Sequence, residues 1–213
     1  MLYWVQLAGV AAFATSGVVA SRGKRPDVVG AFVIAFATAL GGGVIRDAIL
    51  GHPAQSFRDG NTFLVIVGAT LVAMWLPGTI QRLGPTLRVA DAIGLGIFNA
   101  TGTVMALESG SVTPAFAVVL GAVTGSGGGM LRDVLCGEMP ALLQPGELYI
   151  TTCVAGGAVG LLALWLGVSM AFASVAMASV TIGMRLLAIR YRWKLREFHR
   201  DEGLGAAPAP PLR

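Results

Sequence analysis

Two copies of one short motif, a glycine triplet followed by an Arg-Asp pair, carry the most informative chemistry in this chain. They lie 86 positions apart, at residues 41–47 and 127–133, each within a long apolar stretch. Each glycine costs about 1 kcal/mol relative to alanine inside a helix, and charged side chains at membrane depth are costly and usually functional. Repeated broken helices with buried charge indicate a permeation or substrate site. The glycines are Gly41, Gly42, Gly43, Gly127, Gly128 and Gly129, and the charged residues are Arg46, Asp47, Arg132 and Asp133.

The glycine triplets predict helices that bend or unwind. Carbonyl groups freed in this way are tolerated within a membrane only where they face protein or water. Such carbonyls, and the ends of half-helices, are suitable ligands for a partly dehydrated cation. The alternative is that the glycines let helices pack closely. The recurrence of the triplet at matched positions favours a kinked backbone that borders a conducting path.

The arginine and the aspartate of each motif are adjacent, so on a helix they point about 100° apart. We therefore expect no direct pairing within a motif. Instead, the two motifs are predicted to pair with each other, Arg46 with Asp133 and Arg132 with Asp47, with at least one pair beside an aqueous path. The alternative places both motifs at helix ends, solvated and without a part in permeation.

Composition identifies an integral membrane protein. Hydrophobic residues make up 55% of the chain and charged residues only 12%, compared with about 25% charged in soluble domains. The two cysteines and two histidines form no disulfide framework or metal site, so no metal or cofactor is expected. The chain also lacks a nucleophile–base pair and a phosphate-binding loop, which argues against an enzyme.

Seven apolar runs predict an all-α membrane protein with seven transmembrane helices. The runs are residues 2–20, 28–50, 62–80, 89–107, 114–135, 148–166 and 168–189. The motif repeat, together with Gly9 and Phe13 aligned on Gly94 and Phe98, divides them into three-helix repeats at about 2–80 and 89–166. Because three is odd, the second repeat enters the membrane in the opposite sense. The helix at 168–189 completes a single domain, 1–190, which is followed by a basic tail, 191–213.

Basic residues predict the orientation of the chain. They occur in the linkers after the first and third helices and in the tail, at Arg22, Lys24, Arg25, Arg82, Arg88, Arg190, Arg192, Lys194, Arg196 and Arg200. The positive-inside rule then places the N-terminus outside and the C-terminus in the cytoplasm. This placement explains the net charge of +4 without a nucleic-acid partner. The basic run of the tail is either a topology anchor alone or also a contact for anionic membrane lipid.

A few polar residues within the spans are candidates for lining a hydrophilic passage. They are Thr15, Ser16, Asn99 and Thr101. Serine and threonine also bond to the backbone of their own helix, so that role remains an alternative. Asn99 is the stronger candidate, because an amide surrounded by hydrocarbon needs hydrogen-bond partners.

The doubled Gly-Gly-Gly-x-x-Arg-Asp motif, the seven spans and the repeat organisation resemble the prokaryotic trimeric intracellular cation (TRIC) channels, over about residues 2–190. The resemblance implies a homotrimer in the bacterial inner membrane. Each subunit would have its own pore along the second and fifth helices, kinked at the triplets, and would pass K⁺ or Na⁺, chiefly potassium. An alternative is a secondary transporter of a small amino acid such as glycine, a function linked to some bacterial members of this family.

Overall fold

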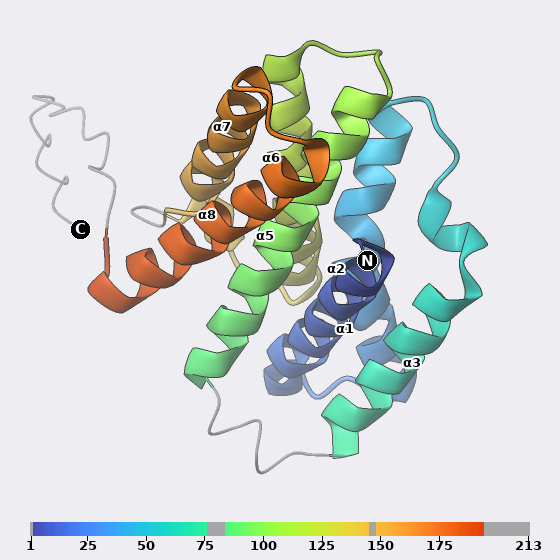
Figure 1. Cartoon of the computed structure of the whole chain (residues 1–213). Helices are drawn as coiled ribbons and strands as arrows, with labels where there is room; N and C mark the ends of the chain where they lie inside the picture. Colours follow the sequence, from blue (N-terminus) through green and yellow to red (C-terminus); the bar gives the residue numbers. More distant parts are fainter. Residues whose placement is uncertain (1, 76–83, 145–147, 194–213) are drawn as a thin grey trace, which may run out of the picture.

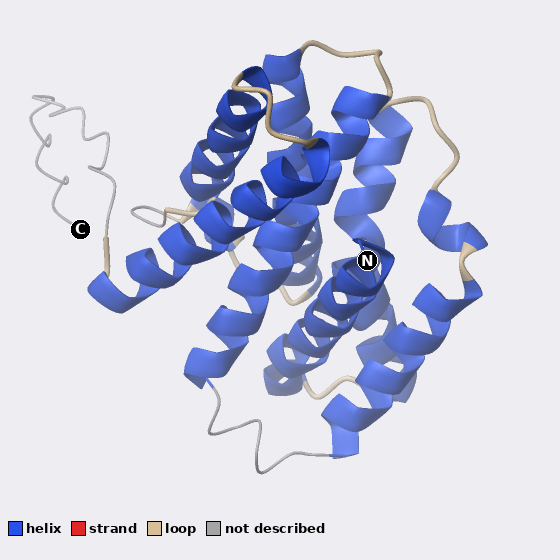
Figure 2. Ribbon diagram, viewed as in Figure 1, coloured by secondary structure: helices blue, strands red, loops and turns tan. Residues whose placement is uncertain are grey.

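The computed structural model describes residues 2–75, 84–144 and 148–193. Within these ranges the chain is helical between its turns and loops and contains no strand (Figure 2). The end of the predicted third span, at 76–80, and Arg82 lie outside the described residues. So do tail residues 194–213, including Lys194, Arg196 and Arg200.

The described chain contains seven long helices, in agreement with the predicted spans. They are α1 (Leu2–Ser21), α2 (Val28–Ile49), α3 (Gly60–Trp75), α5 (Gly84–Glu108), α6 (Pro114–Leu135), α7 (Ile150–Trp165) and α8 (Met170–Tyr191). By length and composition α1, α2, α5, α6 and α8 can cross a membrane, whereas α3 and α7 are shorter apolar helices. Three short 3-10 helices join them: η1 (Arg22–Lys24), η2 (Gln55–Arg58) and η3 (Ala141–Leu143).

The helices that carry the motif begin and end at polar caps and glycines. The side chain of Asp27 accepts a hydrogen bond from the Gly30 amide at the start of α2, and Thr113 does the same for Phe116 at the start of α6. After each helix the chain turns at a glycine with positive φ, +70° at Gly51 and +68° at Gly137. These two glycines are also 86 positions apart, so the repeat includes the helix terminators.

The centre of the bundle is the contact between α2 and α6. Helix α1 packs on α2 and α5, and α3 packs on α1 at one edge, while α7 and α8 pack on α5 at the other (Figure 1). A methyl group on Gly42 would overlap the carbonyl oxygen of Thr124, and one on Gly128 would overlap that of Thr38. Each contact is the repeat equivalent of the other. This reciprocity is consistent with an inverted repeat and shows that α2 and α6 are antiparallel.

The predicted unwinding at the triplets is not found. Residues 41–43 and 127–129 are α-helical and continuous with the rest of α2 and α6, so the expected free carbonyls are absent there. Close packing explains the middle glycine of each triplet instead, because the neighbouring backbone leaves room only for a hydrogen atom at Gly42 and Gly128. Contact between the two helices offsets the low helix propensity of glycine.

We predict that Gly42→Ala destabilises the protein, because the added methyl group overlaps the Thr124 carbonyl oxygen. Overpacking of this kind costs about 1–3 kcal/mol, which thermal unfolding in detergent would detect. Gly43→Ala is the matched control, since its new methyl carbon would lie 3.8 Å from the nearest side-chain atom. Equal melting temperatures for the two variants would contradict the importance of the α2–α6 contact.

Candidate functional site

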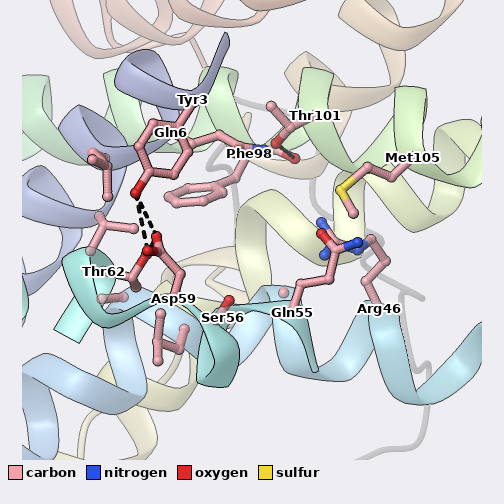
Figure 3. A pocket seen from close by; sticks show the side chains of 15 residues that line it. Tyr3, Gln6, Arg46, Gln55, Ser56, Asp59, Thr62, Phe98, Thr101 and Met105 are labelled. Atoms are coloured by element: carbon pink, nitrogen blue, oxygen red, sulfur yellow. Dashed lines mark hydrogen bonds between the residues drawn. The ribbon is translucent and has the colours of Figure 1, made fainter. Parts of the chain in front are cut away.

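Two polar cavities lie at the C-terminal ends of α2 and α6. The cavity beside α2, here called the first vestibule, has a volume of about 170 Å³ (Figure 3). Its polar lining is Tyr3, Gln6, Arg46, Gln55, Ser56, Asp59, Thr62 and Thr101. The cavity beside α6, the second vestibule, has a volume of about 320 Å³. Its charged lining is Arg88, Asp91, Arg132, Asp133, Glu138 and Arg185. Because α2 and α6 are antiparallel, the two vestibules lie at opposite ends of the bundle.

Each motif forms an ion pair within itself. Arg46 donates through Nε and Nη2 to Oδ1 of Asp47, at 2.8 and 2.6 Å, and the two residues are only 5% and 1% exposed. The other oxygen of Asp47 accepts a hydrogen bond from the backbone N–H of Gln55 at 3.0 Å. The aspartate therefore connects the arginine of α2 to η2.

The second motif repeats this arrangement. Arg132 Nε donates to Asp133 Oδ1 at 2.9 Å, and Asp133 Oδ2 accepts from the Ala141 amide at 2.9 Å. The predicted pairs Arg46–Asp133 and Arg132–Asp47 were therefore wrong. The angle between adjacent positions describes the start of each side chain, but arginine is long enough to curl around the last helical turn. Both motifs do lie near helix ends, as the alternative proposed, but their arginines are buried rather than solvated.

The two arginines differ in their remaining partners. Arg132 Nη1 also contacts Asp91 of α5, at 2.9 Å, and Ser16 of α1, at 2.5 Å. The other oxygen of Asp91 accepts from the Tyr149 hydroxyl at 3.0 Å. Gln6 lies 85 positions before Asp91, the offset that aligns Phe13 with Phe98, and it lines the first vestibule. The second half thus holds its arginine between two carboxylates, whereas the first half supplies one.

The four residues predicted to line a pore lie in different parts of the structure. Thr101 lines the first vestibule, and Ser16 binds Arg132 beside the second. Thr15 is partly exposed and lines neither vestibule. Asn99 is fully buried away from both, and its amide nitrogen donates to the Cys153 carbonyl and the Thr181 hydroxyl. Its hydrogen bonds join α5 to α7 and α8, which is a packing role.

Among the residues that sequence reasoning missed are Tyr3, Asp59 and Asp91, which line the vestibules, and Tyr149, which binds Asp91. Asp91 is near the beginning of the predicted fourth span, where a carboxylate also suits the helix dipole. A carboxylate on the same helical face as Gly94 and Phe98 was the available signal for a buried role. Asp59 lies in a loop, and no sequence pattern places it opposite Tyr3.

Hydrogen bonds lower the pKa of two carboxyl groups that lie outside the helices. The Thr62 hydroxyl donates to Asp59 at 2.7 Å and the Tyr3 hydroxyl donates to both of its oxygens, which lowers the pKa of Asp59. At the second vestibule Glu138 pairs with the exposed Lys24 at 2.8 Å, and this hydrogen bond lowers the pKa of Glu138. Both carboxylates are therefore charged at neutral pH. Among the described residues no group of three or more His, Cys, Asp or Glu could hold a metal ion.

Comparison with known proteins adds a family and a set of structures. Residues 3–77 and 88–166 match the family model described as glycine transporter. The UPF0126 inner membrane protein YadS of Escherichia coli K12 is 38% identical over 205 residues, which cover 95% of this chain and 98% of that protein.

Among solved structures, a TRIC cation channel is 34% identical with a TM-score of 0.83, covering 91% of this chain and 95% of its own. The TRIC orthologue from Rhodobacter sphaeroides is 28% identical with a TM-score of 0.81, covering 90% of this chain and 98% of its own. These descriptions name channels and a transporter family, in agreement with the expectation that the chain is not an enzyme.

We predict that Asp47→Asn destabilises the protein more than Asp133→Asn. Removing one partner of a buried ion pair costs about 3–5 kcal/mol, and Arg46 is bonded to no other carboxylate in the described structure. Arg132 keeps Asp91 at 2.9 Å when Asp133 is changed. Melting temperatures in detergent would measure the difference, with Asp27→Asn as a control because asparagine also caps helices well. A larger loss for Asp133→Asn would refute this ranking.

Proposed function

The chain belongs to the glycine transporter family of membrane proteins and shares the fold of the prokaryotic TRIC channels, and from this we propose that it is a monovalent-cation channel with one pore per subunit. The path runs along α2 and α6, between the first and the second vestibule. The observation that carries the proposal is the pair of polar cavities at opposite ends of the antiparallel α2–α6 contact. The name of the 34% identical relative, a TRIC cation channel, supports the same reading.

The charges of the first vestibule support passage of cations, and the lining of the second vestibule balances three arginines with three carboxylates. A bare guanidinium would repel a cation, but Arg46 is neutralised by Asp47 and Arg132 by Asp91 and Asp133. Asp59 adds a carboxylate to the first vestibule, and its described hydrogen-bond donors are hydroxyl and amide groups rather than cations. Charge of one sign at the mouth of a cleft raises the local concentration of counter-ions. Potassium is the expected principal ion, with sodium also permeant.

The proposal includes the assembly and the membrane placement. The protein forms a homotrimer in the bacterial inner membrane, the location stated in the name of YadS. Its N-terminus is outside and its basic tail, 191–213, is cytoplasmic, in contact with anionic lipid. Lys24 of the basic linker pairs with Glu138, so the second vestibule is cytoplasmic in this proposed orientation. Exposed apolar residues such as Trp4, Trp75 and Trp165 then face lipid or neighbouring subunits.

A carrier of a small amino acid such as glycine is the second candidate. The family description favours it, and so does one feature of the first vestibule. That cavity of about 170 Å³ contains both Arg46 and Asp59, whose opposite charges suit the carboxylate and the ammonium group of a zwitterion.

We predict that the purified protein in planar bilayers gives single-channel currents whose reversal potential in a KCl gradient is near the potassium equilibrium potential. Counterflow of labelled glycine in liposomes would separate the two candidates, because a channel gives none. A reversal potential near that of chloride would reject cation conduction. Saturable glycine counterflow without single-channel currents would establish the carrier instead.

We further predict that Asp59→Asn shifts the reversal potential away from the potassium equilibrium potential, because it removes negative charge from the first vestibule. Asp27→Asn is the matched control, since Asp27 caps α2 at its other end and lines neither vestibule. If the two variants keep the same reversal potential as the wild type, Asp59 has no part in ion selection.

A further inference from the structure

Two aromatic rings from the two repeats stack on each other in the centre of the bundle. Phe13 of α1 and Phe98 of α5 have ring centroids 5.3 Å apart and ring planes inclined by 19°. They occupy corresponding positions, 85 residues apart. Phe13 is 1% exposed, whereas Phe98 is partly buried and its ring reaches the first vestibule (Figure 3).

Glycines of the opposite repeat make room for both rings. A methyl carbon on Gly94 would lie 2.5 Å from the Phe13 ring, and one on Gly9 would lie 3.1 Å from the Phe98 ring. Gly9 and Gly94 are themselves 85 positions apart. The repeat therefore includes two rings and the two glycines against which they rest, so the stack is a duplicated feature of the fold.

The stack lies between the two vestibules on both helices that carry it. On α1, Val10 lines the first vestibule and Ser16 binds Arg132 of the second, with Phe13 midway. On α5, Asp91 lines the second vestibule and Thr101 the first, and Phe98 lies between them in sequence. The spacings of three to seven residues put these side chains on one helical face. A path from one vestibule to the other along this face meets the two rings.

The surroundings of the rings offer little to an ion. Beyond Gly94, the Phe13 ring faces Gly128 of α6, whose added methyl carbon would lie 3.5 Å from it. At this level the rings and glycines offer an ion only carbon in place of its hydration shell, and the nearby oxygen is the Thr38 carbonyl that packs against Gly128. Hydrophobic constrictions of this kind gate channels by excluding water.

We propose that the Phe13–Phe98 stack is the dry constriction of the pore, which closes the path between the vestibules and opens when the two rings separate. This inference rests on the proposed channel function. Its parts are a polar cavity at each end and, between them, an aromatic pair supplied equally by both repeats.

Potassium flux from liposomes tests the constriction. Phe98→Ala and Phe13→Ala should each increase the flux several-fold, because removal of a ring lets water join the vestibules. Phe116→Ala is the matched control, since Phe116 of α6 is 48% exposed and lines neither vestibule. If the wild type conducts and folded Phe98→Ala conducts no faster, the inference is wrong. A wild type without any cation flux would reject the proposed function itself.

Thiol labelling tests the barrier with both rings in place. Thr101→Cys is made in a chain with Cys136→Ser and Cys153→Ala, and a membrane-impermeant thiol reagent is added to one side of the membrane at a time. We expect modification only from the side of the first vestibule, and from both sides once Phe98→Ala is added. Modification from both sides while Phe98 is present would overturn the inference. This measurement requires no ion conduction, so it separates failure of the constriction from failure of the channel.

Discussion

The direct contact of two helix backbones is the constraint on which the rest of this structure depends. Gly42 and Gly128 each rest against a carbonyl group of the other helix, at Thr124 and Thr38. This contact holds α2 and α6 together at their centres, so their C-terminal ends must point to opposite faces of the bundle. Each end then carries its arginine into a cavity. The positions of both vestibules thus depend on glycine, which has no side chain, at positions 42 and 128.

The sequence predicted the architecture well because the residues that repeat, long apolar runs and glycines, allow few other structural interpretations. Apolar runs give the helices, and glycines at offsets of 85 and 86 positions align the two halves. It predicted the local geometry less well. A glycine triplet has two physical uses, a break in a helix or a close approach between helices, and composition cannot distinguish them. Only the position of Thr124 against Gly42 shows that the second use applies.

The errors at the charged residues have a different cause. The direction of a Cα–Cβ bond does not limit where a long, flexible side chain ends. Arginine can fold back to the aspartate beside it, as Arg46 Nη2 does to Asp47 Oδ1 at 2.6 Å. Asp91 of α5 and Tyr149, the residue before α7, complete the second site, and neither belongs to a sequence motif. The replacement of Asp91 by Gln6 in the first half also shows where the duplicated halves have diverged. Symmetry predicts the scaffold, and departures from symmetry give the two vestibules different sets of charged residues.

The carboxylates of Asp47 and Asp133 each hold an arginine with one oxygen and the amide of a following short helix with the other. Each carboxylate therefore links the position of a surface segment to the position of a buried guanidinium. A substitution or deletion in the loop changes where the guanidinium is held, although no interior residue is altered. Loops accept such changes more readily than packed helices do. Homologues with identical interiors can thus differ in conduction through variation confined to their surfaces.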